Sequence, residues 1–142
     1  MGSTEVLLRL NEARDHDLAT PAAARAIDAC VEAAKAALVC ADACAPLAEA
    51  FRLTACVGKT TTASERCWEA AKALLQTVHD RPSVVSRLEA CRAACDEAGA
   101  VCLPHAPHHE FCRICGAACR EASAACGELL AQWRARAEAT PA

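Results

Sequence analysis

The chain has 142 residues, a length that suits one domain with a single hydrophobic core. About a quarter of the residues are Ala and only 3% are aromatic, a composition that favours helices and argues against a β-sheet. The net charge of −3 leaves no basic surplus for nucleic acid, and no apolar run approaches the ~18 residues of a membrane span.

The N-terminal region predicts one short helix followed by a long one. Residues 4–18 are charged and weakly amphipathic, which suits a short helix. This stretch lacks the basic start of an export signal, so we expect a cytoplasmic protein. Thr20 and Pro21 then form an N-cap and a first helical position, which begin an Ala-rich helix that runs to about residue 44.

Three more helices follow along the chain. Pro46 cannot continue the first long helix but can begin a second, which we expect over 46–79 with Gly58 as its weak point. Asp80 caps a third helix, which ends near residue 103. After a loop rich in histidine, a fourth helix is expected over 108–138. The short connections predict an all-α, antiparallel up-down four-helix bundle.

The expected organisation is therefore a single bundle with short extensions. Residues 1–19 form an N-terminal segment with its short helix, residues 20–138 form the bundle, and residues 139–142 form a tail.

All twelve cysteines fall on one face of the four predicted long helices. Their spacing is a ladder of three- and four-residue steps, the pattern of the inward seam of a bundle helix. In chain order they are Cys30, Cys40, Cys44, Cys56, Cys67, Cys91, Cys95, Cys102, Cys112, Cys115, Cys119 and Cys126. The ladder has six further positions, all with small residues: Ala33, Ala37, Thr60, Ala63, Ala98 and Ala122. No charged residue falls on this seam.

The two ends of the seam differ in chemistry. At one end the ladder continues into hydrophobic residues, which predict a closed apolar plug: Ile27, Leu74, Val78, Val84, Leu88, Leu129 and Trp133. At the other end six cysteines lie beside His105, His108 and His109, and we expect metal ions to enter there.

Stacking the helices in layers predicts two clusters of thiolates. One layer next to the plug contains Cys30, Cys67, Cys91 and Cys126, and one layer at the histidine end contains Cys40, Cys56, Cys102 and Cys115. The middle layers keep only Cys95 and Cys119. We therefore expect a thinly liganded waist in which these two cysteines are isolated and poorly metallated.

The charge of the seam favours Cu(I) as the bound metal. Soft thiolates select Cu(I), Zn(II) or iron–sulfur clusters, and thiols in a reducing cytosol are more often metal ligands than disulfides. A buried seam without Lys or Arg cannot balance excess negative charge. One Cu(I) per thiolate is neutral, whereas Zn(II) on four thiolates carries two negative charges. We also expect that helices ~8–10 Å apart do not easily bring four sulfurs around one zinc ion.

At this point two segments resemble a known family. RAIDACVEAAKAALVCADAC (25–44) and HAPHHEFCRICGAACREASAACGELL (105–130) are similar to the cytosolic bacterial copper storage proteins. The resemblance implies a four-helix bundle, usually a homotetramer, that fills its core with many Cu(I) ions through a histidine-lined opening. His105 and His109 match the family, but His108 stands where the family often has Met, and Phe111 where it often has His. The family also has cysteine at most of the eighteen seam positions.

Two other functions remain open from the sequence. The two layers with one cysteine per helix suit iron–sulfur clusters, or zinc, separated by a spacer. Alternatively, the bundle is purely structural and has lost metal binding, with buried cysteines as small hydrophobic residues. No nucleophile–base arrangement is visible, so we expect no enzyme activity. For copper, six thiolate pairs predict a capacity of about six ions, and bridging thiolates raise it toward about twelve.

Overall fold

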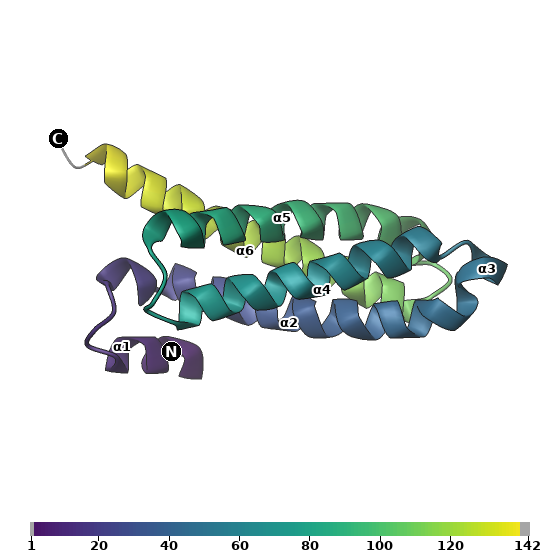
Figure 1. The fold of residues 1–142 in the computed structure, drawn as a ribbon, viewed down its shortest axis with the longest axis horizontal. Helices are drawn as coiled ribbons and strands as arrows, with labels where there is room; N and C mark the ends of the chain where they lie inside the picture. Colours follow the sequence, from purple (N-terminus) through teal and green to yellow (C-terminus); the bar gives the residue numbers. More distant parts are fainter. Residues whose placement is uncertain (1, 140–142) are drawn as a thin grey trace.

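The computed structural model describes residues 2–139, and within that range the regular structure is entirely helical (Figure 1). The α-helices are α1 (Ser3–Leu10), α2 (Pro21–Cys44), α3 (Ala48–Phe51), α4 (Thr54–Leu75), α5 (Arg81–Cys102) and α6 (Glu110–Ala139). Three short 3₁₀ helices are η1 (His16–Leu18), η2 (Ala45–Leu47) and η3 (Leu103–His105). The predicted tail lies, apart from residue 139, outside the described residues.

The four long helices confirm the predicted antiparallel bundle. Helix α2 packs against α4 and α6, and α5 packs against the same two helices, so the four surround a common core. In Figure 1 one end of the bundle contains α3 and the connection from α5 to α6. The opposite end contains the N-terminal segment, and α6 extends past it.

The predicted starts of α2 and α5 are also confirmed, because each has a side-chain cap. The backbone N–H of Ala23 donates to the Thr20 hydroxyl at 3.2 Å, and Pro21 is the first residue of α2. The backbone N–H of Ser83 donates to the Asp80 carboxylate at 2.8 Å. Both caps satisfy amide groups that the first turn of a helix leaves without a partner.

The second long helix is shorter than the predicted range of 46–79. The chain first forms η2 and α3, and Arg52 then adopts a left-handed conformation (φ 56°) that separates α3 from α4. Gly58, the expected weak point, lies inside α4 without a break. At the other end α4 stops at Leu75, so the prediction that Val78 is part of the plug is wrong: it is 80% exposed.

The N-terminal segment also differs from the predicted helix over 4–18. Helix α1 ends at Leu10, and the Asn11 side chain accepts the backbone N–H of Ala13 at 3.1 Å, which favours a turn. The chain then crosses the closed end of the bundle. Arg14 is buried there, although no sequence pattern marked it.

Apart from Val78, the predicted plug is confirmed. Its remaining side chains are all buried: Ile27, Leu74, Val84, Leu88, Leu129 and Trp133. The Trp133 indole N–H donates to the backbone carbonyl of Asp17 at 3.1 Å, and the Arg81 guanidinium lies 4.2 Å from the Trp133 ring centre. The N-terminal segment is thereby attached to the apolar end of the core.

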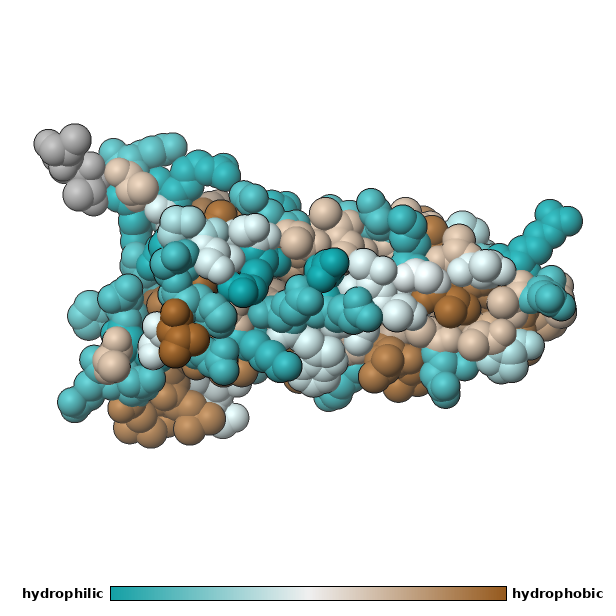
Figure 2. Space-filling model, in the orientation of Figure 1, coloured by the Kyte–Doolittle hydropathy of each residue, from teal (hydrophilic) through white to brown (hydrophobic). Residues whose placement is uncertain are grey.

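The surface of the bundle is mixed in character. Figure 2 shows a hydrophobic patch over α1, where the side chains of Val6, Leu7 and Leu10 are exposed. No described helix combines the length and the apolar character needed to cross a membrane.

Candidate metal centre

The twelve cysteines all face the core of the bundle. Every one is buried and free, with no disulfide bond. The six small residues on the seam are buried as well, which confirms the predicted ladder. Arg14, at the closed end, is the one charged side chain that is buried among residues 2–139.

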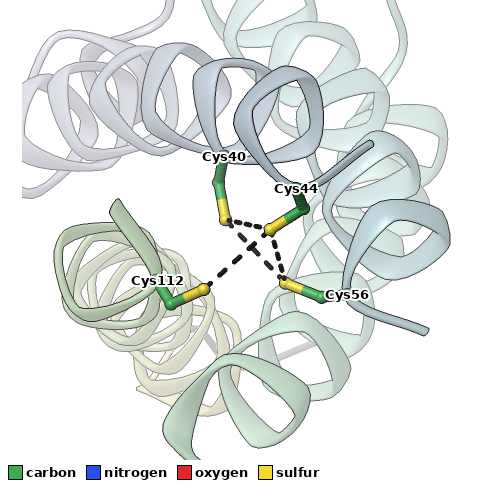
Figure 3. A group of neighbouring side chains, drawn as sticks. All are labelled: Cys40, Cys44, Cys56 and Cys112. Atoms are coloured by element: carbon green, nitrogen blue, oxygen red, sulfur yellow. Dashed lines mark hydrogen bonds between the residues drawn. The ribbon is translucent and has the colours of Figure 1, made fainter. Parts of the chain in front are cut away.

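Four sulfur atoms converge at the histidine end of the core (Figure 3). Helix α2 supplies Cys40 and Cys44, α4 supplies Cys56 and α6 supplies Cys112. The sulfur of Cys44 lies 3.8 Å from that of Cys40, 3.6 Å from that of Cys56 and 4.0 Å from that of Cys112. The four sulfur atoms all lie within 4.8 Å of one another, close enough to share metal ions.

The same set of thiols continues one layer deeper. The sulfur atoms of Cys40, Cys102 and Cys115 lie within 4.8 Å of one another, and the Cys56 and Cys102 sulfurs are 3.6 Å apart. We call the resulting six thiols the outer group: Cys40, Cys44, Cys56, Cys102, Cys112 and Cys115. It contains the predicted layer at the histidine end together with Cys44 and Cys112.

A second set of thiols lies next to the plug. The Cys30 sulfur is 3.4 Å from that of Cys126 and 3.8 Å from that of Cys91. The Cys67 sulfur is 3.5 Å from that of Cys91 and 3.3 Å from that of Cys95. Cys91 therefore joins two groups of three into one inner group: Cys30, Cys67, Cys91, Cys95 and Cys126.

The prediction that Cys95 is isolated in the waist is wrong. Side chains on a helix tilt toward its N-terminus. Helix α5 begins at the closed end, so Cys95 in the waist tilts toward the plug. Helix α4 begins at the histidine end, so Cys67 in the layer next to the plug tilts toward the waist, and the two sulfurs approach each other. Among the described residues Cys119 is outside both groups and lies one helical turn beyond Cys115 on α6. The two predicted clusters thus exist, and the inner one extends into the waist through Cys95.

The electrostatics of the core favour neutral thiols in the absence of metal. Burial is the main reason why the pKa of Cys112 rises from 9.0 to about 11, and the nearby Cys44 adds to the effect. Hydrogen bonds with Cys126 and Cys91, followed by burial, raise the pKa of Cys30. Cys91, Cys102 and Cys119 are different, because hydrogen bonds with neighbouring thiols lower the pKa of each, that of Cys119 to about 5. Each metal ion that binds must therefore displace protons from most of its ligands.

The geometry corrects one step in the argument against zinc. A tetrahedral zinc site with Zn–S bonds of ~2.3 Å needs sulfurs about 3.8 Å apart. In the group of four sulfurs that contains Cys44, four of the six separations are between 3.6 and 4.0 Å, so the helices do bring these sulfurs together. Charge still distinguishes the metals: a four-thiolate zinc site would place two negative charges in a seam where none of the described residues has a cationic side chain.

The three histidines lie at the end of the bundle where the outer group is found. His105 ends η3 and is half-buried, and its charge interacts with the Cys102 thiol. His108 is exposed, whereas His109 is half-buried. Within residues 2–139 no imidazole joins the groups of converging sulfurs. The histidines therefore lie near the outer group in the connection from α5 to α6 and are not part of the thiol groups.

Sequence reasoning missed the aromatic contacts of His109. Its ring stacks on Phe111 with centres 5.2 Å apart and meets the edge of Phe51 at 5.4 Å. The contact with Phe51 depends on the turn at Arg52, which the residue types in the sequence did not predict.

Thr60 on the seam is not an additional metal ligand, since its hydroxyl donates to the backbone carbonyl of Cys56 at 2.6 Å.

Comparison with known proteins agrees with this description. Residues 19–131 match the sequence profile of the copper storage protein family (Csp). A copper storage protein from Streptomyces lividans, loaded with ten copper equivalents, is 36% identical with a TM-score of 0.82, over 91% of this chain and 98% of that one. A comparison with curated protein sequences finds no significant match.

Two further structures from the same organism extend the comparison. The cytosolic protein with five coppers is 38% identical with a TM-score of 0.73, over 81% of this chain and 95% of that one. A variant with two histidines replaced by alanine is 37% identical with a TM-score of 0.71, over 78% and 93% of the two chains. The chain described here belongs to the copper storage protein family.

Proposed function

We propose that this chain stores copper in the cytoplasm, with multiple Cu(I) ions bound by all twelve cysteines inside the bundle. The observation that carries the proposal is the convergence of eleven buried thiols into two groups, in a seam without a cationic side chain among the described residues. Cu(I) on thiolates keeps such a core neutral. The Streptomyces lividans relative, a cytosolic copper storage protein, supports the same assignment.

Copper enters at the histidine end in this proposal. The opposite end is filled by buried side chains and covered by the N-terminal segment, whereas His105, His108 and His109 lie in the connection from α5 to α6, at the end of the bundle that contains the outer group. Neutral imidazole is a good ligand for copper ions, so these residues can receive an ion before the thiols do.

The proposed role is storage without catalysis. The ions are cargo: they enter, bind to thiolates and leave to a stronger or transient acceptor. The expected capacity lies between about six and about twelve ions, depending on how many thiolates bridge two metals.

We further propose that the chain forms a homo-oligomer, a tetramer by its resemblance to the family. Helices α2 and α6 expose Leu38, Val39 and Ile114, and a shallow groove of about 350 Å³ lies between these helices beside Phe111. Burying such apolar side chains against another copy is favourable. Sedimentation analysis of the wild type and of Val39→Glu tests the proposal: the wild type sediments as a tetramer and the variant as smaller species.

Titration of the reduced apoprotein with Cu(I) under nitrogen tests the main proposal. We expect at least about six ions to bind against a competing chelator, with a stoichiometry that native mass spectrometry counts. Parallel titrations with Zn(II), and iron analysis of the protein as isolated, address the alternatives. Uptake of no more than two copper ions, or preferential retention of zinc or iron, contradicts the proposal.

A further inference from the structure

Cys119 occupies a unique place among the cysteines of the core. It is outside the outer and the inner group, and by helical register it lies between them: one turn beyond Cys115 on α6, which packs against α5 with its Cys95. We infer that Cys119 is the relay through which Cu(I) passes from the outer group to the inner group. This inference rests on the proposed storage function and concerns the path of the ions inside the bundle.

The other waist positions offer no alternative path. The small residues between the two groups are buried and have no sulfur: Ala33, Ala37, Thr60, Ala63, Ala98 and Ala122. The single hydroxyl among them donates to the backbone carbonyl of Cys56 at 2.6 Å. A Cu(I) ion that left its thiolates here would stand as an uncompensated charge in an apolar environment, which is very costly.

The inner group cannot be reached from the closed end either. Leu74, Leu88 and Leu129 fill that end and have no exposed surface. Beyond them, Arg14 donates hydrogen bonds to the backbone carbonyls of Leu18 and Leu75, and the N-terminal segment covers the helix ends. An ion bound for the inner group must therefore pass through the waist.

The thiols form a continuous series along this route. From the outer group, Cys119 follows Cys115 by one turn of α6, a spacing that brings the two Cβ atoms within ~5–6 Å of each other. Cys95 is the waist cysteine of the adjacent helix α5. The Cys95 sulfur is 3.3 Å from that of Cys67, and the Cys67 sulfur is 3.5 Å from that of Cys91. Each position thus has a neighbour that can bind the ion before the previous ligand releases it.

Each step along the series is a ligand exchange that conserves charge. A bond forms between Cu(I) and the incoming sulfur, and a bond to the departing sulfur breaks. The incoming thiol gives up its proton, and the departing thiolate takes one up, so the copper remains Cu(I) and no electron moves. The thiol–thiol hydrogen bonds supply short paths for the protons.

The replacement Cys119→Ala interrupts this series. Reduced apoprotein is mixed with Cu(I) delivered as a complex with a weak chelator, and native mass spectrometry follows the number of bound ions with time. The wild type fills both groups. In Cys119→Ala we expect the outer group to fill at the wild-type rate and the remaining ions to bind at least about tenfold more slowly. Anomalous diffraction from crystals soaked for different times locates the first ions in the outer group.

Cys126→Ala is the matched control. Cys126 is also a fully buried cysteine of α6, but it lies at the far end of the inner group, away from the path. We expect this variant to lose capacity without a separate slow phase. A slow phase of equal size in both variants shows a general effect of losing a thiol and overturns the relay.

A rescue variant keeps the test independent of any local damage. Ala98 lies between Cys95 and Cys102 on α5, three and four residues away from them, and shares the layer of Cys119 by helical register. Adding Ala98→Cys to Cys119→Ala moves a thiol to the other side of the waist, and we expect fast filling to return. If Cys119→Ala alone fills the inner group within twofold of the wild-type rate, the relay is wrong although storage stands. A wild type that binds no copper contradicts storage itself.

Discussion

The replacement Arg14→Met tests how the N-terminal segment closes the bundle. The Arg14 guanidinium donates four hydrogen bonds to backbone carbonyls, two to Leu18 and one each to Leu74 and Leu75. Two of these acceptors belong to the last turn of α4, where carbonyls have no partner inside the helix. Methionine keeps a long apolar side chain in the same space but donates no hydrogen bond.

The expected loss of stability follows from these contacts. Hydrogen bonds that involve a charged group contribute about 1.5–3 kcal/mol each, and a buried acceptor left unpaired costs about 1–3 kcal/mol. Removal of the charge returns part of this, because burial already disfavours the guanidinium and lowers the pKa of Arg14. We therefore expect the free energy of unfolding to fall by about 3–5 kcal/mol. For a domain of this size the melting temperature then falls by about 6–20 °C.

The measurement is urea unfolding of reduced apoprotein, followed by circular dichroism. Arg9→Met is the control, since the Arg9 side chain is half exposed on α1, where it pairs with Glu5, and its loss should cost less than about 1 kcal/mol. If Arg14→Met is also within about 1 kcal/mol of the wild type, the carbonyls have found other partners and the N-terminal segment does not secure the closed end.

Three further predictions address the caps, the plug and the thiols. Asp80→Ala removes the cap of α5 and should lower the free energy of unfolding by about 1 kcal/mol in urea titrations, while the exposed Asp42→Ala leaves it unchanged. Leu88→Ala opens a cavity in the plug and should cost about 2–5 kcal/mol in the same assay; a reduced copper count would show that the plug and the thiol groups are not separate. The folded-state pKa of Cys112 is raised from 9.0 to about 11, so its stabilising contribution is complete below pH 9 and disappears as the pH rises to 11. The urea midpoint of the apoprotein should therefore fall across this window, by less in Cys112→Ser, and an equal fall in both contradicts this origin.

The periodicity of the cysteines made the core predictable. A three- and four-residue ladder specifies one face of a helix, and the caps at Thr20 and Asp80 fixed where two of the helices begin. The antiparallel order then followed from the short connections. These features depend on local chemistry, which the sequence contains in full.

The features that sequence reasoning missed depend on tertiary structure. Arg52 adopts a left-handed conformation that Gly or Asn usually occupies, so its residue type gave no signal of the break before α4. From the sequence alone, Arg14 is expected to be an ordinary surface cation. Its burial depends on the backbone carbonyls at the end of α4, which only the folded structure brings next to it. The assumption of flat layers also led to the wrong prediction that Cys95 is isolated. The tilt of side chains along antiparallel helices brings cysteines from different layers together.

The absence of cationic side chains from the seam has a consequence for how the store behaves as it fills. At one Cu(I) per thiolate each ion has replaced one proton, so the full core has the same electrical charge as the empty one. At one Cu(I) per pair of thiolates the core has one negative charge for each ion, which attracts further Cu(I) until the ratio reaches one to one. The upper limit on the cargo is set by the supply of sulfur and by space.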